Sequence, residues 1–269
     1  MNDRFLAERC ALVTGSTSGI GLAIARALGA AGARVGLNGL GSDWQIREAQ
    51  EQVRAAGAAE VRFLAADLAR PEAIEAMIAE AAAWQSIDIL VNCAGVQFTA
   101  PLDSMPTERW DQLIAINLSA AFHTMRLTLP GMAERGYGRV INIASVHGLV
   151  ASIHKAPYVA SKFGLIGLSR VAALEYAAAG SRASGGVTVN CICPGWVETP
   201  LIEPQIAARA AAHDGDREAG IRELLREKQP SQRLSLPEDV AALCTFLCRR
   251  EAHNITGAAL PVDGGWTAQ

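Results

Sequence analysis

Short runs rich in β-branched residues alternate along this chain with alanine-rich segments whose apolar positions recur at helical spacing. The runs predict strands at residues 11–13, 34–38, 61–65, 87–91, 138–143, 187–192 and 258–261. The segments between them predict helices that include residues 20–31, 42–56, 71–84, 107–135, 158–179 and 237–249, of which 107–135 is long enough to bend. Strands joined through helices need crossover connections, which produce a parallel sheet covered on both faces. The pattern therefore predicts a doubly wound α/β fold with a seven-stranded sheet, whose ligand site lies beyond the carboxyl ends of the strands.

Length and composition favour one globular domain. The 269 residues suit a single large domain spanning residues 1–269, because no linker interrupts the pattern. A net charge of -3 argues against a general nucleic-acid binder, which carries a basic face. No run approaches the ~20 apolar residues that span a bilayer, and the segment before residue 10 lacks a signal-peptide core. The six cysteines form no C-x-x-C pair and no metal-site spacing with histidine. We therefore expect a cytoplasmic protein with reduced thiols and no metal site.

One segment breaks the alternation. Residues 200–230 lie between the sixth predicted strand and the last predicted helix, and they contain an alanine-rich stretch followed by a charged, helix-like one. An excursion of this length at the ligand edge of a sheet is more often a mobile lid than a structural wrap. We expect a helical substrate lid inserted within the single domain.

The first predicted strand runs directly into a glycine-rich turn that opens a helix. Gly15, Gly19 and Gly21 let the backbone turn tightly and approach a bulky anion, and the N–H groups that begin the helix attract phosphate. A glycine triplet alone is weak evidence, because any tight strand–helix turn favours glycine. Its place after the first strand of a parallel sheet indicates a dinucleotide site.

Several motifs occur together in one order. The glycine turn has the spacing G-x-x-x-G-x-G, Asn92-Cys93-Ala94-Gly95 follows the fourth predicted strand, and Tyr158-x-x-x-Lys162 comes later. In these features the chain, from about Arg9 to its last residue, resembles the short-chain dehydrogenase/reductase family, which has a Rossmann-type fold and binds a nicotinamide cofactor. Cys93 is a departure, since the family usually has a second asparagine there. The resemblance implies these cofactor-binding residues: Gly15, Thr17, Ser18, Gly19, Ile20, Gly21, Leu40, Asp67, Leu68, Asn92, Ala94, Gly95, Tyr158, Lys162, Pro194, Gly195, Val197 and Thr199.

Tyr158 and Lys162 are four residues apart and so share one face of a helix. Free tyrosine has a pKa near ~10 and is a poor base at neutral pH. A neighbouring ammonium, helped by a positive nicotinamide ring, is expected to lower the pKa of Tyr158. The tyrosinate can then remove a hydroxyl proton while hydride leaves for the cofactor. By resemblance, Ser145 holds the substrate oxygen and Asn117 keeps a proton-relay water in place.

The substrate pocket is expected from the loops after the fourth, fifth and sixth predicted strands, with the lid and the C-terminal segment. These carry Gln97, Ser145, His147, Lys155, Tyr158, Trp196, Gln205 and Trp266. Lys155 and His147 with two amides can bind a small carboxylate, and two indoles can exclude water and limit chain length. The combination favours a short hydroxy acid.

Residues 96–98, 145–149, 194–197, 226–233 and 265–269 resemble one branch of the family. Its members use NAD to interconvert (R)-3-hydroxybutyrate and acetoacetate, and they bind the carboxylate with residues matching Gln97, His147, Lys155 and Gln205. That resemblance favours NAD. The residues after the second predicted strand, Asn38-Gly39-Leu40-Gly41, do not decide between NAD and NADP, since they offer neither an acidic partner for the ribose nor an arginine for a 2′-phosphate.

Two other functions remain open at this point. An NADPH-dependent 3-oxoacyl-thioester reductase would share the four catalytic residues, but it predicts a basic ribose-phosphate site and an open acyl channel. A non-catalytic dinucleotide-binding sensor or scaffold predicts that some of the four are missing, and all are present. Family members are usually tetramers, so the resemblance also implies a homotetramer joined through residues 107–135 and 158–179.

Overall fold

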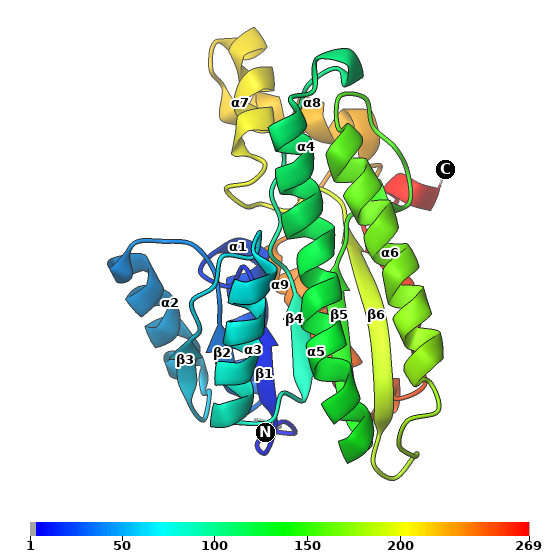
Figure 1. Cartoon of the computed structure of the whole chain (residues 1–269). Coiled ribbons are helices and arrows are strands. Elements are labelled where there is room, and N and C mark those ends of the chain that lie inside the picture. Colours follow the sequence, from blue (N-terminus) through cyan, green and yellow to red (C-terminus); the bar gives the residue numbers. More distant parts are fainter. Residues whose placement is uncertain (1–3, 269) are drawn as a thin grey trace.

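The sheet has seven parallel strands in the order β3-β2-β1-β4-β5-β6-β7, in a computed structural model that describes residues 4–268 (Figure 1). Every neighbouring pair is parallel. The strands are β1 Cys10–Val13, β2 Arg34–Leu37, β3 Val61–Phe63, β4 Ile89–Asn92, β5 Tyr137–Ile143, β6 Gly186–Pro194 and β7 Ala259–Val262. The strand order reverses between β1 and β4, and the carboxyl ends on either side of that point form the ligand edge of such sheets. The predicted doubly wound fold is confirmed.

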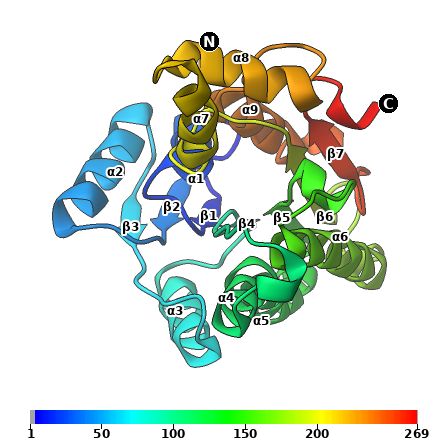
Figure 2. The ribbon, with the colours of Figure 1, turned by 90° about the horizontal axis from the view of Figure 1, so that it is seen from above.

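Helices lie on both faces of the sheet, and Figure 2 shows the two layers from above. Helices α1, α2 and α9 cover one face, while α3, α5 and α6 cover the other. Their bounds are α1 Gly19–Ala30, α2 Asp43–Ala56, α3 Pro71–Trp84, α5 Ala120–Arg135, α6 Ala156–Tyr176 and α9 Pro237–Leu247. No helix among residues 4–268 is long and apolar enough to cross a bilayer.

Burial on both faces explains why the strands are continuously apolar. In β1, Ala11 and Val13 pack in the cluster that contains Ile24 of α1. Leu12, between them, packs in the opposite cluster with Met77 of α3. Successive side chains of a strand point to opposite faces, so a strand buried on both needs an apolar residue at each position.

The predicted helix 107–135 is divided into three parts. Helix α4 Thr107–Ile114 leads into a π-helical turn, Ala115–Ser119, and α5 follows without leaving the helical axis (Figure 1). The backbone N–H of Ala120 donates to the carbonyl of Ala115, which is the i→i+5 bond of a π-turn. Such a turn inserts one residue into the helix and re-aims the side chains within it. Asn117 lies in this turn and is almost fully buried.

Residues 200–230 form a helical excursion above the carboxyl ends of the strands (Figure 1). It consists of α7 Glu203–Ala210 and α8 Arg217–Lys228, joined through a short turn at Ala211–His213. Arg217 donates to Glu198 at 3.2 Å and pairs with Glu203, so the start of α8 is tied to the base of α7. The helical character that the sequence predicts is present, and the role of this segment as a lid stays a prediction.

The amino-terminal edge of the sheet holds a buried cation. Arg139 of β5 is 1% exposed, and its guanidinium donates to the carbonyls of Gly186 at 2.9 Å and Gly185 at 3.1 Å. Two guanidinium carbons lie over the ring of Tyr137, that of Arg9 at 3.7 Å and that of Arg139 at 4.6 Å from its centroid. These contacts join the beginning of β5 to the beginning of β6, at the edge opposite the ligand site.

Candidate active site

The turn after β1 has the geometry of a phosphate site. Gly15 and Gly19 have φ of 63° and 53°, which side chains rarely adopt. A Cβ on Gly15 would lie 2.7 Å from Ala94 Cα, and one on Gly21 would lie 2.2 Å from the carbonyl oxygen of Gly15. Ser18 begins α1 without a side-chain capping bond, so the first N–H groups of the helix stay free for an anion. The turn therefore fits the pyrophosphate of a dinucleotide.

The end of β2 forms the neighbouring rim. Thr17 Oγ1 donates to the carbonyl of Leu40 at 2.7 Å, which fixes the loop against the phosphate turn. The amide nitrogen of Asn38 donates to the carbonyls of Leu64 at 3.0 Å and Ala66 at 3.3 Å. Asn38 therefore joins the ends of β2 and β3, while the side chain of Leu40 is 85% exposed beside the cleft.

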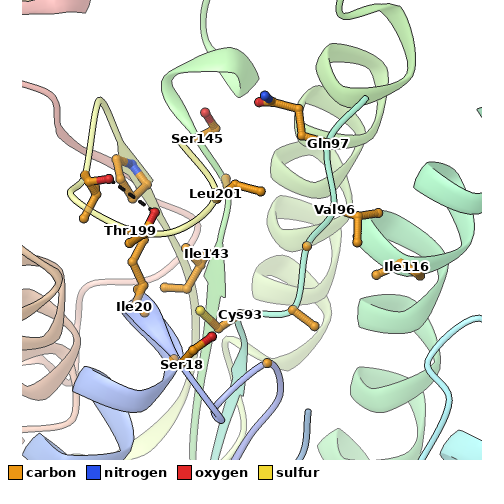
Figure 3. Close-up of a pocket in the computed structure, with 18 of the residues that line it drawn as sticks. Ser18, Ile20, Cys93, Val96, Gln97, Ile116, Ile143, Ser145, Thr199 and Leu201 are labelled. Carbon is orange, nitrogen blue, oxygen red and sulfur yellow. Dashed lines mark hydrogen bonds between the residues drawn. The ribbon is translucent and has the colours of Figure 1, made fainter. Parts of the chain in front are cut away.

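One cavity of about 520 Å³ gathers nearly all the predicted site residues. It runs from the phosphate turn to the loops after β5 and β6. Figure 3 shows Ser18, Ile20 and Cys93 at one end and Gln97 and Ser145 at the other. Of the predicted catalytic, cofactor-binding and substrate-binding residues, all line it except Asn92, Asn117 and Gln205.

These three residues lie outside the cavity wall for identifiable reasons. The side chain of Asn92 donates to Asn142 at 2.8 Å and accepts from Thr124 at 2.8 Å, so it faces the protein interior. The amide of Gln205 donates to carbonyls at the base of α7 and accepts a hydrogen bond from Gln97, in the orientation that satisfies both of its ends. Gln205 thus reaches the cleft only through Gln97.

Asn117 supports the cleft from behind. Its side-chain oxygen accepts from the N–H of Val96 at 2.9 Å, and its nitrogen donates to the carbonyl of Val96 at 2.9 Å. The same nitrogen approaches Ser161 of α6 at 3.4 Å. The π-turn therefore places an amide that holds the loop after β4 against the helix that carries Tyr158.

Tyr158 and Lys162 lie on the cleft side of α6, as their spacing predicts. Lys162 Nζ lies 5.7 Å from the centroid of the Tyr158 ring and donates to the carbonyl of Ile143 at 2.8 Å. Ser145 follows β5, and its Oγ accepts the N–H of His147 at 3.1 Å. Tyr158, Lys162 and Ser145 are all more than 90% buried.

The expected lowering of the Tyr158 pKa is not found in the chain alone. Burial raises the pKa of Tyr158, and a hydrogen bond with Ser145 opposes that rise. Burial also lowers the pKa of Lys162 to about 8. The Lys162 ammonium is directed to the Ile143 carbonyl, and desolvation of the phenol outweighs its hydrogen bond with Ser145.

Aromatic and cationic groups gather beyond the tyrosine. Lys155 is 8% exposed, and its Nζ lies 5.2 Å from the centroid of the Trp196 ring. Trp196 and Trp266 lie 5.5 Å apart between centroids, and the His147 ring meets Trp266 edge-on at 5.4 Å. Among residues 4–268, no carboxylate or hydrogen-bond acceptor partners the Lys155 ammonium. Burial, with the charges of Arg209 and Lys228, lowers the pKa of Lys155 to about 8.

The protonation of His147 follows from one contact. Its Nδ1 lies 3.3 Å from the carbonyl of Val150, which can only accept, so Nδ1 carries the proton. Burial and the charge of Lys155 lower the pKa of His147 to about 4, and the ring is neutral at pH 7. Nε2 is then an acceptor. Lys155 and Gln97, rather than His147, are therefore the donors that this end of the cleft offers to an anion.

Comparison with known proteins identifies the family. A family model described as short chain dehydrogenase matches residues 9–210. The chain belongs to this family. It is 48% identical over 266 residues to the D-beta-hydroxybutyrate dehydrogenase of Cupriavidus necator, covering 97% of this chain and 98% of the relative. It is 47% identical over 262 residues to the protein of the same name from Rhizobium meliloti, covering 97% and 99%. The crystal structure of L-sorbose reductase from Gluconobacter frateurii, complexed with NADPH and L-sorbose, matches at a TM-score of 0.90 and 30% identity over 99% of each chain.

Membership of the family makes the chain an oxidoreductase with a nicotinamide cofactor. The structure adds cleft residues that sequence reasoning did not select. Cys93 faces the phosphate turn in Figure 3, and Ile143, Val96 and Ile202 line the same cavity. Each of them ends a strand, follows one or begins the lid, so the position at the ligand edge was the signal that could have identified them. Gln229 follows α8 and accepts a hydrogen bond from the N–H of Trp196, and no feature of the sequence indicated this role.

Proposed function

We propose that this dehydrogenase interconverts (R)-3-hydroxybutyrate and acetoacetate with NAD⁺ and NADH. The observation that carries the proposal is the buried Lys155 ammonium, which has no anionic partner among the described residues and lies in the cleft that also holds Tyr158 and Ser145. A buried cation without a partner is costly, so its presence indicates that a ligand carboxylate completes the site. The 47% and 48% identical relatives, named for hydroxybutyrate, support the same substrate.

The residues of the cleft divide the chemistry among them. Ser145 orients the substrate hydroxyl, and Tyr158 removes its proton in the oxidation and returns it in the reduction. Lys155 and Gln97 bind the carboxylate, which fixes the carbinol carbon relative to Tyr158. Trp196 and Trp266 exclude water from the carboxylate end. A bound nicotinamide would take up the hydride in the oxidation and return it in the reduction, and the positive charge of its oxidised form would favour the tyrosinate.

The chain's own residues also favour NAD over NADP. The phosphate turn, Leu40, Asp67 and Leu68 would hold the dinucleotide. The segment from residue 38 to residue 43 contains no arginine or lysine and ends in Asp43, the first residue of α2. A 2′-phosphate would therefore meet no cation on this loop to neutralise it.

Initial rates with each enantiomer test the proposal. We expect NADH to form with (R)-3-hydroxybutyrate and NAD⁺, and we expect much slower turnover with the (S) enantiomer or with NADP⁺. An acetoacetyl thioester with NADPH serves as the competing substrate pair. Faster turnover of that pair than of acetoacetate with NADH would replace the proposed function by thioester reduction.

A further inference from the structure

Gln229 is a polar side chain that is almost completely buried at the end of the lid. It follows the last residue of α8 and is 1% exposed. Its Oε1 accepts the N–H of Trp196 at 3.1 Å, and its Nε2 donates to the carbonyl of Arg233. Its backbone N–H donates to Leu225 at 2.8 Å. Both ends of the amide are therefore used to hold backbone, and burying it without those bonds would be costly.

Two glycines make room for this side chain. A Cβ on Gly195 would lie 2.8 Å from Gln229 Oε1 and 2.9 Å from Asp263 Cα. A Cβ on Gly264 would lie 2.7 Å from Gln229 Cγ. The turn after β6, the end of the lid and the segment that leads to Trp266 therefore meet around Gln229.

The main chain of Trp196 is held entirely by the segment that leaves the lid. Its N–H donates to Gln229, and its carbonyl accepts the N–H of Ser235 at 3.0 Å. The indole Nε1 is buried and has no hydrogen-bond partner among the described residues. No side-chain hydrogen bond therefore orients the ring, and its position against Lys155 and Trp266 depends on packing and on these main-chain bonds.

We propose that Gln229 is a positioning residue, which holds Trp196 in place as a wall of the substrate cleft and so sets the discrimination between short and longer hydroxy acids. The inference rests on the proposed function, because it assigns Trp196 to the substrate end of the cleft. Gln229 touches neither substrate nor cofactor in this scheme. It acts through the backbone of Trp196, and it couples that wall to the end of α8.

Substitution of Gln229 by methionine keeps the length of the side chain and removes both amide bonds. The measurement is the ratio of kcat/KM for (R)-3-hydroxybutyrate to that for (R)-3-hydroxypentanoate. A methylene in an apolar pocket is worth about 10-fold or more in such ratios, so we expect Gln229→Met to lower the ratio by about 5-fold, with KM for NAD⁺ within about 2-fold of the wild type. Gln229→Glu retains an acceptor for the Trp196 N–H, and we expect a ratio closer to that of the wild type.

Gln232→Met is the matched control. Gln232 lies in the same turn, and its Nε2 only caps the carbonyl of Gln229 at 3.2 Å. We expect its ratio to stay within about 2-fold of the wild type, as for a change that leaves the pocket wall intact. A Gln229→Met ratio equal to that of Gln232→Met overturns the inference, as does an equal loss of kcat/KM for both hydroxy acids.

A crystal structure of Gln229→Met separates this inference from the proposed function. We expect the Trp196 and Trp266 rings to depart from their 5.5 Å centroid separation. An unchanged ring pair contradicts the positioning role, whatever the substrate is. If the wild type oxidises no 3-hydroxy acid while the ring pair moves in the variant, the proposed function fails and the positioning role stands. If Gln229→Met does not fold, Gln229→Asn decides, because its amide is one methylene too short to reach both the Trp196 N–H and the Arg233 carbonyl. A Gln229→Asn ratio within about 2-fold of the wild type then overturns the inference.

Discussion

Burial and catalysis make opposite demands on the Tyr158 hydroxyl. The position that brings it to Ser145 inside the cleft also raises its pKa, so the residue is a protonated phenol in the chain alone. Substitution by phenylalanine removes the hydroxyl and retains the ring. We expect Tyr158→Phe to lower kcat by about 100-fold or more, because general acid–base catalysis supplies about that factor.

Steady-state kinetics measures kcat, and a titration of NADH fluorescence measures cofactor binding, so the two together test this prediction. The dissociation constant for NADH should change little, since the dinucleotide is held mainly by the turn after β1. Tyr176→Phe, at the other end of α6, is the matched control and should keep wild-type kcat. If Tyr158→Phe kept wild-type activity, the assignment of Tyr158 as the general acid–base residue would be wrong.

The burial of Lys155 is better explained by ligand binding than by a contribution to the stability of the fold. Its ammonium is buried and has no anionic partner within residues 4–268, so we expect Lys155→Ala to leave the melting temperature unchanged or higher. A charge-assisted hydrogen bond is worth about 1.5–3 kcal/mol, so KM for 3-hydroxybutyrate should rise by about 10- to 100-fold. KM for NAD⁺ should not follow it. Lys228→Ala, which removes a cation 6.0 Å from the Trp266 ring, should have a much smaller effect.

The lowered pKa of Lys155 predicts a pH dependence of substrate affinity. Burial sets this pKa at about 8, so the ammonium is present below that pH and is lost above it. A carboxylate binds the protonated form, and KM for 3-hydroxybutyrate should therefore be level below pH 8 and rise about 10-fold per pH unit above it. Initial rates between pH 6 and pH 10 measure this profile. A level profile in Lys155→Ala assigns it to Lys155, and an unaltered profile in that variant would assign it to another group.

At the scale of elements, the excursion at residues 200–230 packs an apolar surface against the two tryptophans of the cleft. Ile202, Ile206, Ile221 and Leu224 pack in one cluster with Trp196 and Trp266. We expect ligand binding to hold this surface closed. Amide hydrogen exchange within residues 203–228 should then slow by about 10-fold or more in Tyr158→Phe supplied with NAD⁺ and (R)-3-hydroxybutyrate, relative to the free protein. Exchange in β5 gives the internal reference, and equal exchange of α7 and α8 in both states would mean that the segment is a fixed wrap.

The sequence was sufficient to predict the helices and strands whose apolar residues recur at regular spacing, and the turns that require glycine. The first strand and the helix spacing of Tyr158 and Lys162 could be predicted because each depends on local geometry. The π-turn around Asn117 was not, since one inserted residue leaves the apolar pattern of a long helix almost unchanged. The inward orientation of Asn92 depends on Asn142 and Thr124, which are distant in sequence. Gln229 could not be found either, because a polar residue at a helix end is normally solvated.

The protonation states of the site residues could not be predicted from the sequence either. The spacing of Tyr158 and Lys162 correctly indicated a shared face, but not that desolvation of the phenol would prevail. His147 was expected to bind a carboxylate, and its contact with Val150 shows that the neutral ring offers an acceptor to the cleft instead. Such outcomes depend on burial and on the direction of single hydrogen bonds.

At the scale of the whole molecule, one helix leaves an apolar stripe uncovered. Phe163, Gly167, Val171 and Leu174 lie three or four residues apart on α6, and the three large side chains are 45%, 52% and 80% exposed. A stripe of this kind indicates burial against another copy of the chain. We expect sedimentation to show four copies, and we expect Val171→Glu to dissociate them into smaller species. Trp44→Glu, which changes a similarly exposed apolar residue on α2, should leave the assembly intact.

The buried guanidinium of Arg139 and the catalytic groups lie at opposite ends of the sheet. Ser145 lies just beyond the carboxyl end of β5, whereas Arg139 lies near the start of that strand and bonds to the start of β6. Substitutions at the amino-terminal end of the sheet can therefore change thermal stability, while substitutions at the carboxyl-terminal end change kcat. Directed evolution that varies only residues near Arg139 should yield variants with a higher melting temperature and with the kcat of the parent enzyme.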